Sequence, residues 1–435
     1  MVKLKFKEIN ESYTLEEALK EAKRCLNCKN PQCRTGCPID NDIPGFIHQL
    51  SMGNMGAAMN IINERSNLPA ICGRVCPHEN QCEGHCVLHA KGKGLNIGKL
   101  ERFVADFDTD MKLIRERLPR KMRGKVAVIG SGPAGLTVAG DLARQGFNVT
   151  IFEREAKAGG VLMFGIPQYR LPKEVVQKEI EKIEEMGVAF ATECVVGVDI
   201  TVDTIFERGF DAIFIGTGTN LPQTLNIPGN TLRGVVQSVH VLHMSSIYNE
   251  GFVGRDAIPL HTGEKVAVIG CGNVAIDGAR TALRLGAQSV DIVYRKTINE
   301  MPALMSEYEG AVSEGVNFLW QHTPLEFIGT TDNRLKALRV STPEGEKVLP
   351  YDRILLAVGS RPADRIVSTT KGIDVDEKGY VVTKERPYGM TTRRGVFAGG
   401  DVVHRPQTVV LAMREAKKVA AGIAQYVDAV KLLEE

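Results

Sequence analysis

Two similar stretches decide the fold: Lys125-Val-Ala-Val-Ile-Gly-Ser-Gly-Pro-Ala-Gly135 and Lys265-Val-Ala-Val-Ile-Gly-Cys-Gly-Asn-Val-Ala275. Each reads as an apolar strand, a glycine-rich turn and the start of a helix. A second strand follows each of them, at 148–155 and at 289–296. This order is typical of a dinucleotide-binding βαβ unit. Two copies in one chain predict an α/β fold with two Rossmann-like domains.

The remaining segments predict that the second domain is inserted in the first. Strand-like AIFIGTGT (212–219) follows the first unit, and RILLAVGS (353–360) follows the second. The C-terminal GVFAGGDVV and the helical segment after it belong with neither copy alone. We expect a helical N-terminal domain at 1–120, the first dinucleotide domain at 121–225 and 363–435, and the second at 226–362.

The first glycine loop has the features of a pyrophosphate site. Gly130 permits a tight turn, Gly132 lets the backbone approach a phosphate, and Gly135 lets the helix pack on the strand. Glu153 ends the next strand, where a carboxylate can accept hydrogen bonds from ribose hydroxyls. Strand, loop, helix, strand and acid together favour dinucleotide binding over a purely structural turn.

The second loop predicts a different nucleotide. Gly270, Gly272 and Ala275 form the accepted variant of the motif, but the next strand ends in Arg295 and Lys296. An acid there would repel a 2′-phosphate, whereas Arg295 can bind it bidentately and Lys296 adds a point charge. The motif therefore favours NADP, and the alternative is that both are solvated surface cations.

Composition excludes some partners and locations. The 435 residues carry a formal net charge of +2, which makes neither nucleic acid nor an anionic membrane an expected partner. The N-terminal segment has no apolar signal core, and no apolar run reaches transmembrane length. We therefore expect a cytoplasmic protein.

Cysteines are concentrated near the N-terminus: eight of the ten lie between Cys25 and Cys86. Their spacing is C-x2-C-x4-C-x3-C-P from Cys25, followed by C-x3-C-P from Cys72 and C-x3-C from Cys82. Such spacing is typical of iron–sulfur proteins, and structural zinc or disulfides are the alternatives. Counting alone suggests two clusters with four cysteines each.

The motifs in their order resemble one superfamily of electron-transfer proteins. The cysteine-rich segment is followed by GSGPAG, GGVLMFGIPQYRLP, VIGCGNVAIDGARTALRLGA, EMPA and VFAGGDVV. This set resembles the small subunit of NADPH-dependent glutamate synthase. It is also similar to the N-terminal half of dihydropyrimidine dehydrogenase and to the large subunit of NADH-dependent ferredoxin:NADP oxidoreductase. The resemblance implies FAD in the first dinucleotide domain, NADPH in the second, and two [4Fe–4S] clusters in the N-terminal domain.

The resemblance also implies a different ligand count. One cluster would be held by Cys25, Cys28, Cys33 and Cys86, and the other by Cys37, Cys76, Cys82 and Glu101. Glu101 lies in NIGKLERF, the segment matching a non-cysteine ligand, and a carboxylate can replace a thiolate as donor. Cys72 would then be a spare thiol. The alternative for Glu101 is an exposed helix carboxylate.

Nucleotide-binding residues follow from the same resemblance. Thr408 would begin a helix whose dipole faces the flavin pyrimidine ring. The FAD set comprises Gly130, Gly132, Pro133, Ala134, Gly135, Glu153, Gly160, Leu162, Arg170, Gly400, Asp401 and Thr408. The NADP set comprises Gly270, Gly272, Asn273, Val274, Arg295, Lys296, Val358 and Gly359.

The expected function is an NADPH-oxidising flavin and iron–sulfur oxidoreductase. Hydride transfer from NADPH to FAD needs no side-chain acid or base, so no catalytic residue is named. Single electrons would pass through the clusters to a protein partner: a glutamate synthase large subunit, a dihydropyrimidine dehydrogenase catalytic subunit, ferredoxin, or a sulfur-compound acceptor. A flavin disulfide reductase would need a redox-active cysteine pair that GGVLMFGIP lacks. A zinc-stapled FAD scaffold is the non-enzymatic alternative.

Overall fold

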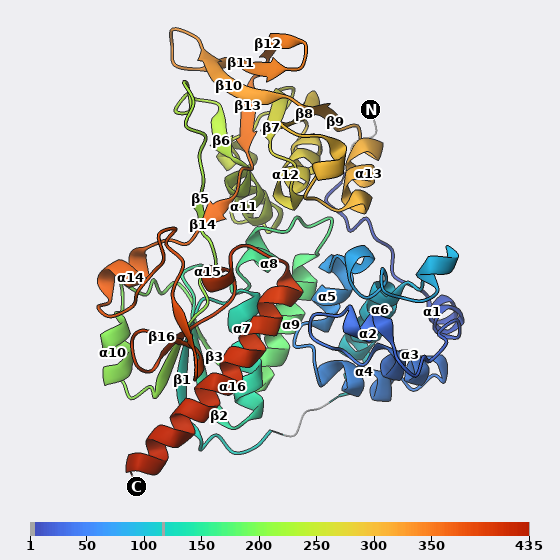
Figure 1. The fold of residues 1–435 in the computed structure, drawn as a ribbon, viewed down its shortest axis with the longest axis vertical. Helices are drawn as coiled ribbons and strands as arrows, with labels where there is room; N and C mark the ends of the chain where they lie inside the picture. Colours follow the sequence, from blue (N-terminus) through green and yellow to red (C-terminus); the bar gives the residue numbers. More distant parts are fainter. Residues whose placement is uncertain (1–4, 115–117, 435) are drawn as a thin grey trace. The chain divides into compact units, whose positions relative to one another are not determined.

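The computed structural model describes residues 5–114 and 118–434, which form two compact units (Figure 1). The large unit comprises Ile9–Met163, Lys173–Asn220 and the chain from Arg361 onward. The small unit comprises residues 5–8, Phe164–Pro172 and Leu221–Ser360. The small unit thus interrupts the large one, which confirms the predicted insertion.

The division also differs from the expected boundaries in two ways. The helical N-terminal region clusters with the first dinucleotide domain, and Phe164–Pro172 clusters with the second. Buried polar contacts explain the first difference, since Asn67 Nδ2 lies 3.1 Å from the Thr137 carbonyl and 2.8 Å from Asp141 Oδ1. Lys417 Nζ contacts the same Asp141 at 3.0 Å. The exact boundaries near 225 and 362 stay a prediction.

The N-terminal region of the large unit is a cluster of short helices. They surround an apolar core that includes Phe46, Ile47, Leu50 and Leu100. Its α-helices are α1 (Leu15–Ala22), α2 (Gln32–Thr35), α3 (Ile43–Ser51), α4 (Met55–Asn63), α5 (Pro69–Val75) and α6 (Ile97–Met111). Two 3₁₀ turns, η1 (His78–Asn80) and η2 (His89–Lys91), join α5 to α6. The cysteines lie mostly in the irregular segments between these helices.

The rest of the large unit is built on a seven-stranded sheet with order β15-β16-β17-β4-β1-β2-β3. The five strands from β17 to β3 are parallel, and β15 and β16 pair antiparallel at one edge. The strands are β1 (Gly124–Ile129), β2 (Phe147–Phe152), β3 (Ala189–Ala191), β4 (Ala212–Ile215), β15 (Thr383–Glu385), β16 (Tyr388–Thr391) and β17 (Val396–Ala398). The helices are α7 (Pro133–Arg144), α8 (Val161–Phe164), α9 (Lys173–Glu185), α10 (Val202–Glu207), α14 (Arg365–Thr369), α15 (Asp401–His404) and α16 (Val409–Glu434). Continuous apolar strands such as β1 are buried on both faces, as a parallel sheet requires.

The small unit repeats this plan with a five-stranded parallel sheet of order β6-β13-β7-β8-β9. A separate antiparallel sheet is formed by β10, β11 and β12. The strands are β6 (Val235–Gln237), β7 (Lys265–Ile269), β8 (Ser289–Tyr294), β9 (Asn317–Trp320), β10 (Thr323–Gly329), β11 (Leu335–Thr342), β12 (Gly345–Pro350) and β13 (Arg353–Leu356). The helices are α11 (Ser238–Asn249), α12 (Asn273–Arg284) and α13 (Met305–Ser313), with 3₁₀ turns η3 (Arg255–Ala257) and η4 (Ile298–Glu300). A short ribbon of β5 (Leu221–Pro222) and β14 (Ser360–Arg361) lies where the chain enters and leaves this unit.

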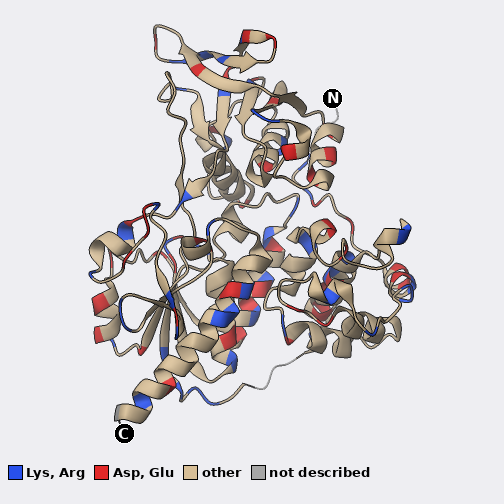
Figure 2. Ribbon diagram, viewed as in Figure 1, with Lys and Arg blue, Asp and Glu red and all other residues tan. Residues whose placement is uncertain are grey.

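Charged side chains of both signs are mixed along the surface helices. Figure 2 shows Lys and Arg alternating with Asp and Glu along α16. No helix within residues 5–114 and 118–434 combines the length and apolar character needed to cross a membrane.

Candidate functional site

The first glycine loop joins β1 to α7 at the carboxyl edge of the large sheet. Gly130 has φ +95°, a conformation that glycine adopts at no steric cost. A Cβ on Gly135 would lie 1.9 Å from the Gly130 carbonyl oxygen, so the helix packs this closely only with glycine there. Gly132 caps α7, and a Cβ on it would meet no described atom within 4 Å. The open space before the helix N-terminus is suited to a phosphate.

Glu153 follows β2 and is 5% exposed. Its Oε2 accepts hydrogen bonds from the Ser131 amide, at 3.0 Å, and from the Ser131 hydroxyl. Its Oε1 accepts one from the Glu155 amide at 2.9 Å. The carboxylate therefore fixes the glycine loop, and a carboxylate with about four acceptor positions still has capacity for a ribose hydroxyl.

Two more segments of the large unit reach the same helix N-terminus. A Cβ on Gly160 would lie 3.0 Å from the Gly132 Cα, and a Cβ on Gly400 would lie 2.8 Å from the Ala134 Cβ. Gly400 has φ +72° and directly precedes Asp401. Gly160 and Gly400 thus both lie against the start of α7, and the side chain of Leu162 is fully buried.

The segment after Gly400 carries polar groups suited to a bound flavin nucleotide. Burial raises the pKa of Asp401 to about 6, against a hydrogen bond that its Oδ1 accepts from the Gln407 amide at 3.2 Å. Thr408 Oγ1 is buried and has no hydrogen-bond partner among the described residues. A buried hydroxyl without a partner is costly, and a polar ligand at this position would satisfy it. These residues therefore fit FAD.

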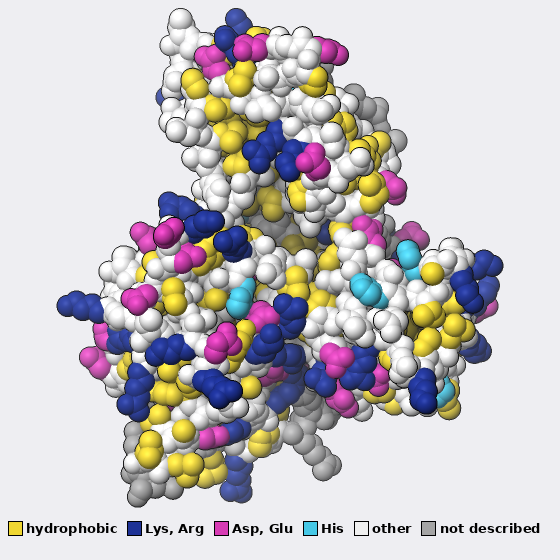
Figure 3. Space-filling view, in the orientation of Figure 1, with side chains coloured by type: hydrophobic (Ala, Val, Ile, Leu, Met, Phe, Trp, Pro, Cys, Tyr) yellow, Lys and Arg dark blue, Asp and Glu magenta, His cyan; other side chains and the backbone are white. Residues whose placement is uncertain are grey.

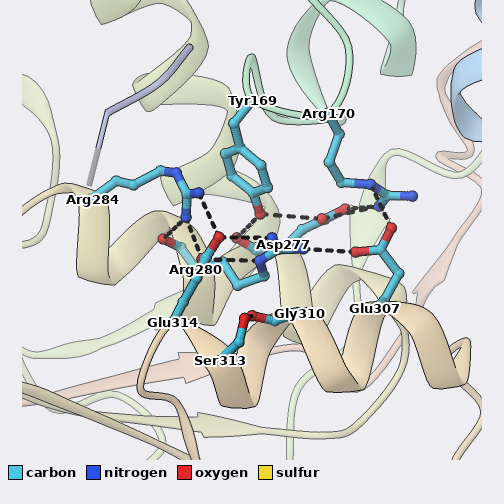
Figure 4. A network of polar contacts seen from close by, with 9 residues as sticks. All are labelled: Tyr169, Arg170, Asp277, Arg280, Arg284, Glu307, Gly310, Ser313 and Glu314. Carbon is cyan, nitrogen blue, oxygen red and sulfur yellow. Dashed lines mark hydrogen bonds and ion pairs between the residues drawn. The ribbon is translucent and has the colours of Figure 1, made fainter. Parts of the chain in front are cut away.

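Arg170 lies in the small unit, where its guanidinium is used in a buried network (Figure 4). Its Nη1 lies 2.8 Å from Asp277 Oδ2, and its Nε lies 3.1 Å from Glu307 Oε1. The guanidinium of Arg284 lies over the ring of the neighbouring Tyr169, 3.8 Å from the ring centroid. Sequence reasoning expected either an FAD contact or a surface cation, and the structure rules out the surface position, since Arg170 is 8% exposed. Its FAD contact stays a prediction.

The same network continues through α12 and α13. Arg280 and Arg284 each contact Glu314, at 2.7 and 2.6 Å. Burial alone would raise the pKa of Glu314, but hydrogen bonds from Arg284 and Arg280 lower it to about 2. Because α12 begins directly after the second glycine loop, this network holds the helix that the nucleotide would meet.

The second glycine loop has the geometry of the first. Gly270 has φ +121°, and a Cβ on it would lie 2.4 Å from the Ala357 carbonyl oxygen. Gly272 caps α12, whose first residues Asn273 and Val274 are exposed. Gly359, after Val358, has φ +103° at the end of the neighbouring β13 segment.

Arg295 and Lys296, the two cations predicted to bind a 2′-phosphate, differ in whether another side chain already pairs with them. Lys296 Nζ lies 3.1 Å from Glu300 Oε1, so part of its charge is already paired. Arg295 is exposed and makes no hydrogen bond or ion pair with a described residue. Arg295 is thus the cation that remains available to an anionic ligand.

Four cysteines line one hollow of about 380 Å³ in the N-terminal region: Cys25, Cys28, Cys33 and Cys86. They form the set that the resemblance implies for the first cluster. Burial raises the pKa of Cys33 to about 11, so this thiol is protonated near neutral pH. A tightly bound metal ion would displace that proton. Among the described residues, no three Cys, His, Asp or Glu side chains converge closely enough to hold one metal ion.

A second hollow of about 330 Å³ is lined by Cys37, Cys72, Cys76, Cys82 and Glu101, together with Asn41, His78 and Gln81. Glu101 is 8% exposed, and no described residue donates a hydrogen bond to its carboxyl group. Burial, followed by the charge of Glu179, raises its pKa to about 8. A buried carboxyl group without a donor is suited to a cation. The exposed position considered for Glu101 is therefore wrong.

Cys72 lies in the same hollow and is also buried. Its thiol contacts Met413 Sδ at 3.6 Å and Ser66 Oγ at 3.9 Å. The pKa of Cys76 is raised well above its ordinary value by a hydrogen bond with Cys72 and by burial. The structure thus brings both candidates for the fourth ligand, Cys72 and Glu101, to one hollow.

Sequence reasoning missed three polar residues around these sites. Asn41 and His78 in the second hollow gave no motif signal, although His78 follows Cys76-Pro77 directly. Burial lowers the pKa of His78 to about 4, so its imidazole is neutral near pH 7. Asp277, the partner of Arg170, had only the weak signal of a carboxylate that directly follows the apolar Val274-Ala-Ile276.

Comparison with known proteins separates the cysteine-rich N-terminal region from the part of the chain that holds both glycine loops. Residues 2–113 match the family described as dihydropyrimidine dehydrogenase domain II, 4Fe-4S cluster. Residues 124–416 match the pyridine nucleotide-disulphide oxidoreductase family.

Two solved structures share the fold of the second part. FprA of Mycobacterium tuberculosis in complex with NADPH has TM-score 0.59 at 19% identity, over 72% of this chain and 86% of that chain. Thioredoxin reductase of Lactococcus lactis has TM-score 0.53 at 25% identity, over 70% of this chain and 99% of that chain. Fold and sites therefore define an iron–sulfur flavoprotein of the pyridine nucleotide oxidoreductase class.

Relatives over nearly the full length narrow the class. The glutamate synthase [NADPH] small chain of Halomonas elongata is 35% identical, over 97% of this chain and 93% of the relative. The same chain of Escherichia coli K12 is 31% identical, over 98% and 95%. The NAD-dependent dihydropyrimidine dehydrogenase subunit PreT of that organism is 34% identical, over 97% of both chains. The chain belongs to the family of NADPH-dependent glutamate synthase small chains and their relatives, and it is a pyridine nucleotide-dependent oxidoreductase that uses FAD and [4Fe–4S] chemistry.

Proposed function

We propose that this chain oxidises NADPH and delivers single electrons, through two [4Fe–4S] clusters, to a separate acceptor protein. When bound, FAD accepts hydride from NADPH and releases electrons singly to iron–sulfur centres. The observation that carries the proposal is that the flavin site and the two cysteine-lined hollows lie next to one another in the large unit. Val410, near the start of α16, lines the second hollow, and Ile43 lines both hollows. The two hollows are therefore neighbours, and the second one borders the helix that follows Asp401, which supports transfer of electrons in this order.

The ligand sets of the proposal are Cys25, Cys28, Cys33 and Cys86 for the first cluster, and Cys37, Cys76, Cys82 and Glu101 for the second. The hollows that these residues line support this division. A partnerless carboxyl group favours Glu101 as the fourth ligand, whereas Cys72 already has thiol contacts with Ser66 and Met413. The zinc-stapled scaffold has no comparable support, because the matched family carries a 4Fe-4S cluster.

The residues around the flavin site act by binding and orientation. The N-terminus of α7 and the amides of the first loop favour the pyrophosphate, and Glu153 holds that loop in place. Thr408 and Asp401 supply a hydroxyl and a carboxyl group at the start of α16. No side chain is needed to move a proton in the hydride step.

NADPH rather than NADH is proposed as the donor of this chain. Arg295, exposed and without a described partner, is available to a 2′-phosphate at the end of β8. The relative PreT is named for NAD dependence, so nucleotide choice varies among similar chains. The cysteine chemistry also favours a reducing compartment, and we propose the cytoplasm.

The proposed acceptor site is the surface around the first hollow. Leu26 and Val87 line this hollow and are 57% and 40% exposed. Segments 23–34 and 86–93 border it and carry Lys23, Lys29, Lys91 and Lys93, whereas Arg24 and Arg34 of the same segments are paired with Glu21 and Asp40. Figure 3 shows apolar and basic side chains next to one another on this N-terminal region. An apolar centre with a basic border fits an acidic protein partner, such as a catalytic large subunit or a ferredoxin.

A charge-reversal experiment tests the acceptor proposal. Lys29→Glu combined with Lys93→Glu should lower the rate of electron delivery to an acidic ferredoxin about tenfold at low ionic strength. The effect should shrink as salt is added. Ferricyanide reduction by NADPH should change little, and Lys347→Glu in β12 of the small unit serves as the control. Equal rates with the acidic protein would contradict this docking site, and failure of the wild type to reduce any one-electron acceptor would contradict the function.

A further inference from the structure

The loop between β8 and α13 contains the EMPA segment, Glu300-Met-Pro-Ala303, which the proposed mechanism does not use. Its apolar residues fix it to the small unit, because Ala303 is buried in the core around α12 and Met301 packs against that core. Pro302 reaches the second glycine loop, since a Cβ on Gly272 would lie 3.9 Å from Pro302 Cγ. The segment therefore borders the position predicted for the pyrophosphate of the nucleotide.

Glu300, the first residue of this segment, is held beside the two cations that follow β8. Its carbonyl oxygen accepts a hydrogen bond from the Tyr294 hydroxyl at 2.9 Å. Its Oε2 accepts hydrogen bonds from the hydroxyl and the amide of Thr297, at 3.2 and 3.4 Å. Its Oε1 lies 3.1 Å from Lys296 Nζ, and the two side chains are 48% and 45% exposed. A ligand that reaches Lys296 therefore meets a carboxylate there as well.

The Glu300 carboxylate is charged at neutral pH, because the hydrogen bonds from Lys296 and from the Thr297 amide lower its pKa. A phosphate oxygen bound to an ammonium group lies about 2.8 Å from the nitrogen. While Lys296 keeps its contact with Glu300, a phosphate on Lys296 would thus lie within about 6 Å of the carboxylate. This separation is shorter than the Debye length of about 10 Å at 0.1 M salt, so the two negative groups repel each other.

We infer that Glu300 determines nucleotide specificity by weakening the preference for NADPH: its carboxylate competes with the 2′-phosphate for Lys296 and repels that phosphate. The inference rests on the proposed function, in which Arg295 and Lys296 bind the 2′-phosphate. Binding of NADPH must either draw Lys296 away from Glu300 or bring the phosphate close to the carboxylate, and both lower the affinity. NADH has a neutral 2′-hydroxyl and is subject to neither effect. Specificity is a difference between two affinities, so Glu300 narrows that difference.

The test removes the charge of Glu300 without shortening its side chain. In Glu300→Gln the amide oxygen can still accept the hydrogen bond from Thr297, because Glu and Gln both serve at this position of a capping box. Glu344→Gln is the matched control, since Glu344 forms an exposed ion pair with Lys347 at 2.6 Å in the turn between β11 and β12. Dissociation constants of NADP⁺ and NAD⁺ are measured by isothermal titration calorimetry on the purified full chain, where no turnover takes place.

In Glu300→Gln, we expect the dissociation constant of NADP⁺ to fall about fivefold at low ionic strength and that of NAD⁺ to stay nearly unchanged. The gain should shrink as salt is added, because salt screens the repulsion in the wild type. It should also be smaller in a Lys296→Gln background, where no ammonium group is left for the carboxylate to occupy. Glu344→Gln should bind both nucleotides as the wild type does.

Three results with Glu300→Gln would overturn the inference. The first is an unchanged dissociation constant for NADP⁺. The second is an equal gain for NAD⁺, which would indicate a rearranged loop. The third is weaker binding of NADP⁺, which would show that the ion pair holds Lys296 in place for the phosphate.

Arg295→Gln separates these results from a failure of the proposed function. If Arg295→Gln weakens NADP⁺ binding while Glu300→Gln changes nothing, only the role of Glu300 is wrong. If the wild type binds NAD⁺ as tightly as NADP⁺ and Arg295→Gln changes neither constant, the proposed nucleotide preference is wrong as well.

Discussion

Arg295 and Lys296 follow the same strand but have different surroundings. Lys296 is paired with Glu300 at 3.1 Å, and this carboxylate has its own pKa lowered by that lysine. Arg295 has no such partner among the described residues. Two adjacent cations that look equivalent in the sequence are therefore expected to contribute unequally to binding of a 2′-phosphate.

Replacing Arg295 by Gln should raise the KM for NADPH and leave that for NADH nearly unchanged. Loss of a charged bidentate contact costs about 1.5–3 kcal/mol, or roughly 10- to 150-fold in affinity. Lys296→Gln should have the smaller effect because its charge is partly neutralised by Glu300. Steady-state kinetics with both nucleotides measure this. A wild type that prefers NADH would show that Arg295 does not bind a 2′-phosphate.

Cys72 and Glu101 are the two candidates for one ligand position in the second hollow. If Glu101 is the ligand, Cys72→Ala should keep all of its iron, while Glu101→Ala should lose or alter one cluster. Glu101→Cys should retain the cluster with a changed potential, because a thiolate is a softer and more covalent donor. Iron analysis and the visible spectrum measure both changes. Loss of half the iron in Cys72→Ala would show that the simple eight-cysteine partition is right.

At the scale of elements, the junction of β1 and α7 combines two kinds of glycine. A Cβ on Gly135 would collide with the Gly130 carbonyl oxygen, at 1.9 Å, whereas one on Gly132 would enter open space. Packing of the helix on the strand thus requires glycine at 135, whereas no described atom would clash with a side chain at 132. Only a ligand gives a reason to keep Gly132 small.

Gly132→Ala and Gly135→Ala should therefore fail in different ways. Gly132→Ala should fold normally and retain its iron, but its affinity for FAD should fall about 10- to 150-fold as backbone contacts to the phosphate are lost. Gly135→Ala should destabilise the unit, by about 1–3 kcal/mol from overpacking. Far-UV circular dichroism, thermal unfolding and FAD titration distinguish the two. Unaltered FAD affinity in Gly132→Ala would argue against a phosphate at this helix N-terminus.

Across the whole molecule, the sequence predicted the two repeated βαβ units and the concentration of cysteines near the N-terminus. The two glycine loops and their strands form the two parallel sheets, and the insertion of one dinucleotide domain in the other is confirmed. These features depend on local patterns of apolar residues and glycines, which a single sequence displays directly. The cysteines likewise gather in two groups along the chain, and they line two hollows.

The sequence could not predict contacts between residues far apart in the chain. Arg170 and Asp277 are 107 residues apart, and no local pattern indicates that they pair or that 164–172 belongs with the small unit. The same holds for Asn67 with Asp141, which joins the helical region to α7. His78 and Asn41 have no motif of their own, and only tertiary packing brings them to the second hollow.

The central claim is that one chain carries NADPH oxidation and two iron–sulfur clusters in electronic contact. The most direct measurement is anaerobic NADPH titration of the purified protein, after its FAD, iron and acid-labile sulfide have been quantified. We predict about one FAD and about eight iron and sulfide per chain, with cluster reduction by NADPH in the absence of any other reductant. Stoichiometric zinc without sulfide, or clusters that stay oxidised while NADPH reduces the flavin, would contradict the account.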